Sequence, residues 1–237
     1  MIDMTKGRPL SHLIKYAFPL LLGNLMQLLY NAVDSVIAGR FIGQDALAAE
    51  GIAEPVMNMI ILLISGITIG AGVLMSEAFG AKEMDRVRKI NATTLILGLI
   101  AGSAVGVSGF FLSRYILILM DTPMSILDKT TLYLSITFLG VPFVFVFNAL
   151  SAGLKSVGDS KTPLLFLAFS SILNAVLDLI FLGLLGFGII CSATTTVVAE
   201  IVSAFLALWW TGAKNKEIFP RAEDLRIKKD NVLSIVK

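Results

Sequence analysis

Residues 55–76, PVMNMIILLISGITIGAGVLMS, form an apolar stretch without a charged side chain. At about 1.5 Å per residue, a helix of this length crosses a hydrocarbon core of roughly 30 Å. Similar charge-free windows occupy residues 16–33, 90–113 and 130–154. Each window is long enough for one transmembrane helix, so the sequence predicts a membrane protein rather than a water-soluble domain.

A fifth window, residues 162–199, is long enough for two spans and contains one charge, Asp178. Its middle is broken by three glycines that favour a tight turn, namely Gly183, Gly186 and Gly188. We therefore expect helices over residues 162–185 and 189–212. Together with a mean hydropathy of +0.85, these windows predict an all-α, polytopic membrane protein with a bundle of six transmembrane helices.

The distribution of Lys and Arg predicts the orientation. Six spans place both termini on one side, and cytoplasmic loops hold an excess of basic residues. Of the 19 basic residues, all except Arg40, Arg114 and Lys129 fall on the side of the termini. We therefore predict a multi-pass protein of the plasma membrane of a prokaryote with both termini cytoplasmic. Residues 1–213 form the transmembrane domain, and the polar residues 214–237 form a cytosolic tail or the start of a linker.

The sequence lacks the residues that several classes of function require. A single cysteine, Cys191, excludes an intramolecular disulfide, and with a single histidine, His12, it leaves few thiolate or imidazole metal ligands. The sequence contains no His-Glu-x-x-His, no Gly-x-Ser-x-Gly and no glycine-rich phosphate loop. We expect no enzyme activity, no cofactor and no nucleic-acid partner.

Three carboxyl groups fall inside the predicted spans: Asp34, Asp178 and Glu200. A charge at the bilayer centre costs at least ~2.5 kcal/mol, which makes such residues functional candidates. Counted along a helix, Asp34 lies roughly 28 Å beyond Lys15, and Asp178 lies roughly 25 Å beyond Lys161. The two aspartates therefore share one depth, in the outer half of the membrane.

Other polar residues are spaced to join them. The first helix carries four on one face: Asn24, Gln27, Asn31 and Asp34. Asn174 lies one turn before Asp178, and Thr196 of the sixth helix reaches a similar depth. An oxygen-rich cluster suits a hard monovalent cation such as sodium, and two close carboxylates can hold a proton. The alternative is that each carboxylate only faces a watery crevice; Glu200, one turn from Thr196, is either part of the cluster or packed inside the bundle.

Small residues and prolines also mark the helices. Glycines four apart, which allow close helix packing, occur on the second and third helices at Gly66, Gly70, Gly98, Gly102 and Gly106. Pro19 and Pro142 fall within spans, where they either kink a helix or belong to its first turn.

The run LYNAVDSVIAGRFIG at residues 29–43, followed by ALAA at 46–49, resembles the first-helix signature of the multidrug and toxic compound extrusion (MATE) family. Further matches are GLKSVGDSKTP at residues 153–163 and GLLGFG at residues 183–188. The resemblance covers residues 5 to about 213. It implies that the chain equals the N-terminal lobe of a twelve-helix transporter in which two six-helix lobes surround a central cavity.

The resemblance also implies residue roles. Four residues match an N-lobe cation site, which would bind sodium in a sodium-coupled protein: Asp34, Asn174, Asp178 and Thr196. Tyr30 and Asn148 match neighbours of that site, with Asn31 and Glu200 as further members of the network. Pro19 matches a helix-one proline implicated in bending during proton-coupled transport. Glu200 departs from the pattern, which more often has Gln.

The expected function is cation-coupled antiport, driven by sodium or protons, of cationic or amphipathic drugs and toxic compounds out of the cell. This chain would supply the N-lobe cation site and half of the substrate cavity, with the lipid bilayer and a second six-helix lobe or another copy of itself as partners. Two alternatives stay open. One is a lipid-linked oligosaccharide flippase of the same superfamily, and the other is a non-transporting half-length membrane subunit.

Overall fold

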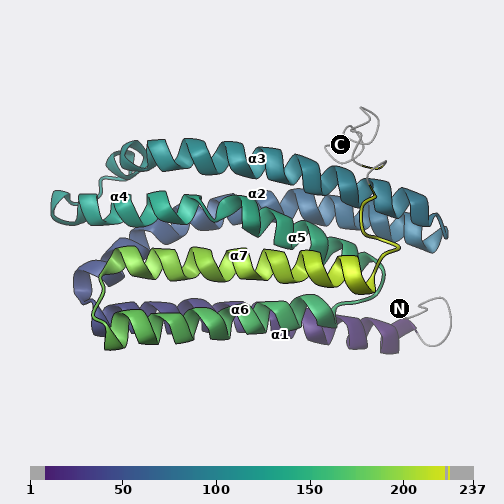
Figure 1. The fold of residues 1–237 in the computed structure, drawn as a ribbon, viewed down its shortest axis with the longest axis horizontal. Helices are drawn as coiled ribbons and strands as arrows, with labels where there is room; N and C mark the ends of the chain where they lie inside the picture. The colour runs from purple at the N-terminus through teal and green to yellow at the C-terminus, as the bar shows by residue number, and fades with distance from the viewer. Residues whose placement is uncertain (1–8, 222–223, 225–237) are drawn as a thin grey trace.

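The fold is a bundle of long helices that run side by side along one axis (Figure 1). The computed structural model describes residues 9–221 and 224, and its regular elements there are all helices. In order, they are α1 Pro9–Phe41, α2 Gln44–Gly80, α3 Met84–Leu119, α4 Met124–Phe138, α5 Val141–Ser156, α6 Lys161–Asp178, the π-helical segment η1 Leu179–Leu184, and α7 Ile189–Lys214.

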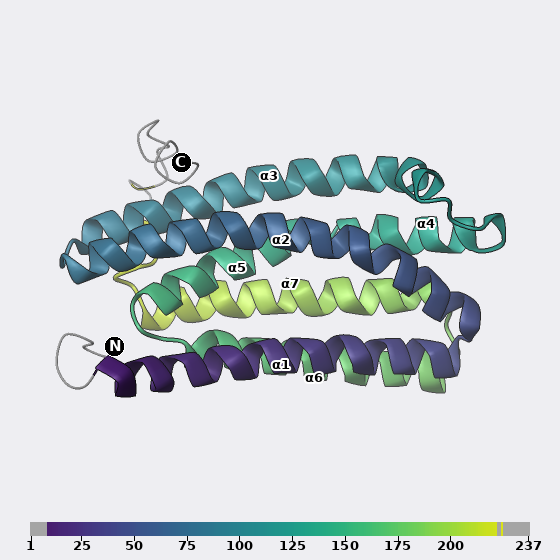
Figure 2. The same cartoon turned by 180° about the vertical axis from the view of Figure 1, so that it is seen from behind.

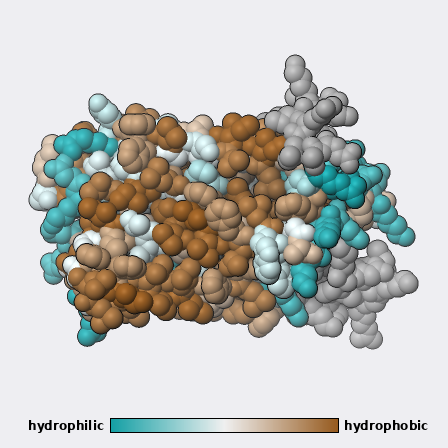
Figure 3. Space-filling view, in the orientation of Figure 1, coloured by the Kyte–Doolittle hydropathy of each residue, from teal (hydrophilic) through white to brown (hydrophobic). Residues whose placement is uncertain are grey.

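The predicted six spans are confirmed. Among the described residues, five helical segments are long and apolar enough to cross a membrane, and α4 with α5 makes a sixth when this bent pair is counted as one span. The last two spans, expected over residues 162–185 and 189–212, are Lys161–Leu184 and Ile189–Lys214. Figure 3 shows an apolar belt between two more polar ends, as expected for a bundle that sits in a bilayer.

The fourth span is broken rather than continuous over residues 130–154. α4 and α5 meet at a bend of 41°. Pro142 lies in the first turn of α5 and has no N–H to donate to the Phe138 carbonyl, so the helix cannot continue through it unchanged. At the break, a Cβ on Gly140 would overlap the Glu200 carboxylate of α7. The bend and the glycine together make room for a carboxyl group inside the bundle.

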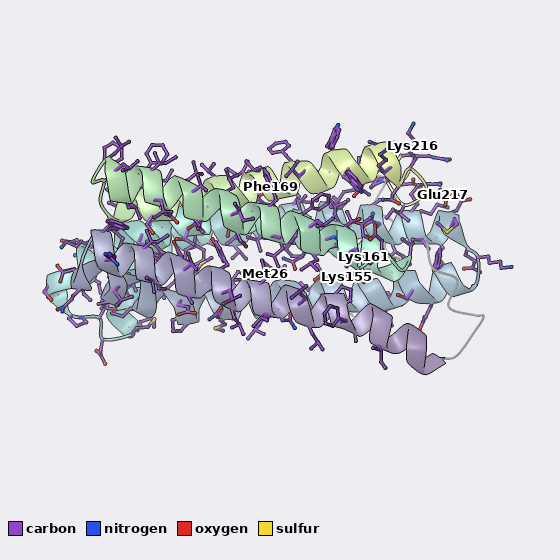
Figure 4. The ribbon with its side chains drawn as sticks, turned by 90° about the horizontal axis from the view of Figure 1, so that it is seen from below. Met26, Lys155, Lys161, Phe169, Lys216 and Glu217 are labelled. Carbon is purple, nitrogen blue, oxygen red and sulfur yellow. The ribbon has the colours of Figure 1, made fainter. Side chains whose placement is uncertain are left out.

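The helices are ordered so that α1 and α6 lie along one edge of the bundle and α3 along the other (Figures 1 and 2). α7 packs against α6 on one side and against α4 and α5 on the other. The start of α1 and the end of α7 lie at the same end of the bundle (Figure 1). Lys155, Lys161 and Lys216 lie toward that end (Figure 4).

Close packing between α3 and the broken fourth span relies on glycine, as the spacing on the third helix predicted. Gly102 and Gly106 face Pro142 and Phe138, and a methyl group at Gly106 would lie 2.8 Å from the Phe138 carbonyl oxygen. On α2 the expectation was wrong for Gly66, which is exposed and has nothing within 4 Å of an added Cβ.

The substitution Gly106→Ala should therefore destabilise the bundle. The methyl group must displace backbone, at a net cost of about 1–2 kcal/mol after the better helix propensity of alanine is counted. The measurement is the thermal unfolding midpoint of the purified protein in detergent. Gly66→Ala is the matched control and should be neutral or slightly stabilising, and an equal loss in both variants would contradict the packing assignment.

The segment after α7 folds back onto the start of α3. Ile218 is fully buried, and its carbonyl accepts a 2.8 Å hydrogen bond from Asn91. Arg88 forms a 2.5 Å ion pair with Asp224 and a second, at 2.9 Å, with Asp85. This part of the segment that the sequence predicted as a tail thus lies against the bundle.

Burial of Asp224 opposes its ionisation, but hydrogen bonds from Arg88 and from the Arg221 N–H outweigh burial and hold the pKa of the Asp224 carboxyl below its usual value. Ionised Asp224 therefore stabilises the docked segment above the ordinary aspartate pKa of about 3.9, and this contribution is lost as the pH falls through the lowered value.

Asp224→Asn should release this segment at neutral pH, because the neutral amide loses the ion pair with the guanidinium and keeps at most a weaker hydrogen bond. We expect the backbone amides of residues 215–221 to exchange hydrogen several-fold faster, whereas wild-type protein should show this release only in acid. Glu83→Gln, which removes an exposed ion pair with Arg86 at the same end of α3, is the control and should change little. Unchanged exchange in Asp224→Asn would contradict the role of the ion pair.

Candidate functional site

The candidate site begins on α1, two turns before the helix ends at Phe41. Asp34 is half-buried there, and its Oδ1 atom is buried without a hydrogen-bond partner. Tyr30 lies one turn earlier on the same face, as the spacing of four predicts. α1 packs chiefly against α6, so both side chains approach the helix that carries the second aspartate.

Asp178 lies where α6 changes its winding. It is the last residue of α6, and the six residues that follow form a π-helix, a rare conformation that is frequent at functional sites. Asp178 is completely buried. The Thr195 hydroxyl of α7 donates a hydrogen bond to Oδ1 of Asp178, while Oδ2 has no partner.

Asn174, one turn before Asp178, is also buried, with 1% of its surface exposed. Its amide nitrogen lies 3.4 Å from the Thr196 hydroxyl oxygen of α7. The Asn174 carbonyl oxygen has no partner. Thr196 thus joins α6 to α7, and Tyr30 of α1 lies near enough to interact with it.

The two aspartates come together across the helix interface. Asp34 and Asp178 lie on helices that pack against each other, α1 and α6, and are close enough to influence each other's charge. Two carboxylates at such a distance repel, so a proton shared between them or a bound cation is needed to hold them together. The structure thus brings together the four residues that the sequence nominated, Asp34, Asn174, Asp178 and Thr196.

Unpartnered oxygens are concentrated in this cluster. A buried polar atom without a partner is uncommon and calls for an explanation. Three such oxygens belong to the cluster: Asp34 Oδ1, Asn174 Oδ1 and Asp178 Oδ2. They are acceptors only, which suits a proton or a hard cation as the missing partner. Within the described part of the chain, however, no group of three or more His, Cys, Asp or Glu side chains is arranged to hold a metal ion.

Other predicted residues lie at the margin of the cluster. Asn148 is half-buried on α5 and donates its amide to the Val144 carbonyl of its own helix. Asn31 is half-buried on α1, and Pro19 is buried within that helix, which continues through it. Glu200 packs against Gly140 at the α4–α5 break, and it lies close enough to Tyr30 to act on it electrostatically.

Sequence reasoning missed three residues that contact the cluster or extend it, namely Thr195, Ser192 and Glu50. Thr195, rather than Thr196, bonds to Asp178. Glu50 of α2 is buried, and its Oε1 accepts a 3.0 Å hydrogen bond from the Ser192 hydroxyl of α7. Glu50 could have been found by helical periodicity, because it shares a face with Ala46, Ala53 and Met57.

Comparison with known proteins places the chain among transporters. A family model described as MatE matches residues 19–180. "Probable multidrug resistance protein YpnP" of Bacillus subtilis is 33% identical over 210 residues, which cover 88% of this chain and 47% of the relative. "Probable multidrug resistance protein YoeA" of the same organism is 36% identical over 197 residues, covering 81% and 42%. "Protein DETOXIFICATION 44, chloroplastic" of Arabidopsis thaliana is 29% identical over 217 residues, covering 86% and 41%. The chain spans about half the length of the curated relatives it matches.

Solved structures agree in fold. "Crystal structure of MATE in the bent conformation" superposes with a TM-score of 0.90 and "Crystal structure of MATE in the straight conformation" with 0.88. Each is 24% identical to this chain and is matched over 97% of this chain and 51% of the solved one. The resemblance noted in the sequence is confirmed, and the multi-pass helical chain is a transporter relative rather than an enzyme. Because the family model covers more than half of its residues, the chain belongs to the MatE family.

Proposed function

We propose that the chain is the N-terminal lobe of a cation-coupled antiporter that exports drugs or other toxic organic compounds. The observation that carries the proposal is that Asp34 and Asp178 lie on contacting helices inside a membrane-spanning bundle, each with a buried oxygen that lacks a hydrogen-bond partner. A structural role alone would not offset the cost of placing two carboxyl groups there. Binding an exchangeable proton or cation would give the two carboxyl groups a function there.

A proton is favoured over sodium as the coupling ion. The two aspartates lie on contacting helices and influence each other's charge, as the members of a pair that shares a proton do. A sodium ion would require more oxygens around a common centre than the three unpartnered ones that the cluster offers, which are Asp34 Oδ1, Asn174 Oδ1 and Asp178 Oδ2. Asn174 and Thr196 then orient the pair and supply hydrogen bonds as its charge changes.

The charge of the site favours cationic or amphipathic substrates. Four acidic side chains are buried or half-buried toward the interior: Asp34, Glu50, Asp178 and Glu200. Competition between a proton and an organic cation for this acidic interior would give antiport, because occupation by one weakens binding of the other. A second six-helix lobe would complete the cavity, with residues 214–237 as the start of the linker. The excess of basic residues at the termini supports a plasma-membrane protein with cytoplasmic termini.

The test is export of the cationic dye ethidium from efflux-deficient bacteria that express the lobe together with a second MatE lobe. Export should stop when a protonophore collapses the proton gradient and continue when sodium is replaced by choline. Export that stops on sodium removal would reverse the choice of ion. Dye release that does not depend on either gradient would contradict coupled transport altogether.

A further inference from the structure

A third acidic group lies beside the aspartate pair, on a helix that does not contribute to it. Glu50 is on α2, with 6% of its surface exposed. Its Oε1 atom accepts the Ser192 hydrogen bond, and its Oε2 atom is buried with no partner. When Glu50 is ionised, this buried oxygen therefore lacks the hydrogen-bond donor that would stabilise its charge.

The groups that face Glu50 are acidic or neutral. Asp34 of α1 and Asp178 of α6 are close enough to act on it electrostatically, as are Tyr133 of α4 and Glu54 of its own helix. Among residues 9–221 and 224, the ion pairs of lysine and arginine do not include Glu50. A buried carboxylate without a positive partner is unfavourable, and protonation removes the cost.

One turn of α7 connects Glu50 to the aspartate pair. Ser192 donates its hydroxyl to Glu50, and its carbonyl oxygen lies 2.8 Å from the Thr195 hydroxyl and 3.1 Å from the Thr196 hydroxyl. Thr195 also bonds to Asp178. A threonine hydroxyl has a single proton, so Thr195 donates either to the carboxylate or to its own backbone. The bonding of this turn therefore depends on the charge of Asp178.

We propose that Glu50 is a second proton-holding position of this lobe, separate from the Asp34–Asp178 pair and coupled to it through charge and through the Ser192–Thr196 turn. This rests on the proposed proton-coupled function. On loading, an oxygen of the Glu50 carboxylate gains a proton from a hydronium ion, which leaves as water. The lobe then carries two exchangeable protons, one on the pair and one on Glu50.

The test counts protonated carboxyl groups by infrared difference spectroscopy between acid and alkaline pH, on the purified full chain in lipid nanodiscs. In a Glu200→Gln background, which removes the remaining interior carboxyl group, the protein should show two titrating bands, one from the Asp34–Asp178 pair and one from Glu50. Glu50→Gln should remove one band and leave the other, while Asp178→Asn should leave the Glu50 band and change the other. Ser192→Ala should shift the frequency of the Glu50 band, because the carboxyl group loses its hydrogen bond.

Glu54→Gln is the matched control, because Glu54 lies one turn away on the same helix but is exposed. It should keep both bands, with at most a small displacement in pH. Glu50→Asp should keep a second titrating band, which separates loss of the proton site from misfolding. An unchanged spectrum in Glu50→Gln would overturn the proposal. The dye assay tests the proposed function separately. Loss of export in Asp34→Asn, together with both bands in the spectrum of the unsubstituted pair and Glu50, would support both proposals. Full export in Asp34→Asn would refute the proposed function.

Discussion

Asp178→Asn should abolish gradient-driven ethidium export, reducing it to the level of cells that lack the transporter. The amide keeps the volume of the carboxyl group and lowers the cost of membrane insertion, so the protein should still reach the membrane in normal amount. The amide, however, cannot carry an exchangeable proton or a charge. Asp34→Asn should have the same effect, and the double variant should be no worse than either single one, because the two carboxyl groups act as a unit.

Three controls make this result specific. Asp45→Asn removes an exposed aspartate near the same end of the bundle, where it pairs with Lys129 at 2.7 Å, and should export normally. Asn174→Ala should slow export less than either aspartate variant, because it removes an oxygen but no charge. Glu200→Gln should retain export, since Glu200 packs at Gly140 rather than on the pair and three acidic side chains remain in the interior. Wild-type ethidium export in Asp178→Asn would refute the assignment of the site. Loss of export in Glu200→Gln would add Glu200 to the site.

The spans were predictable because the bilayer imposes one strong rule. A segment in hydrocarbon must be apolar and helical over a fixed length, and charge-free windows reveal that directly. The windows showed only the part in hydrocarbon: residues 55–76 belong to a helix that runs from Gln44 to Gly80. The break between α4 and α5 was signalled by Pro142, but its bend depends on Gly140 meeting Glu200 of a distant helix.

The candidate site was partly predictable for the same reason. Asp34 and Asp178 stand out because charges are costly inside a span. Glu50 was hidden because it precedes the charge-free window of α2, where an acidic residue looks like part of the membrane rim. Thr195 could not be separated from its neighbours in the run Thr194–Thr196, since one residue of helical rotation decides which hydroxyl faces Asp178. In the structure, Thr194 is exposed and Thr195 is buried.

The chain alone, reconstituted into vesicles as a monomer, should move no dye under an imposed proton gradient. In transporters built from repeats, one bundle moves against another around a site between them, and a single bundle has no counterpart. The face of α1 shows what is missing. Only 6% of its apolar span is buried, against 44% for α7, and its polar residues Asn24 and Gln27 are exposed. Amide side chains that face lipid are unfavourable, so this face needs a polar partner.

Co-reconstitution with a second six-helix MatE lobe should restore export, with the stoichiometry measured by mass photometry. Asn24→Leu combined with Gln27→Leu is the discriminating variant. It should leave the lobe folded, because both side chains are exposed, but should lower export by tenfold or more, the effect of about 1.4 kcal/mol or more of lost pairing free energy. Cysteine cross-linking from position 24, in a background lacking the single native Cys191, should capture the partner lobe. Gradient-driven dye movement by a proven monomer, or full export by the double leucine variant, would show that this face does not pair, whereas activity confined to the two-lobe assembly would establish it as the interface around the cation site.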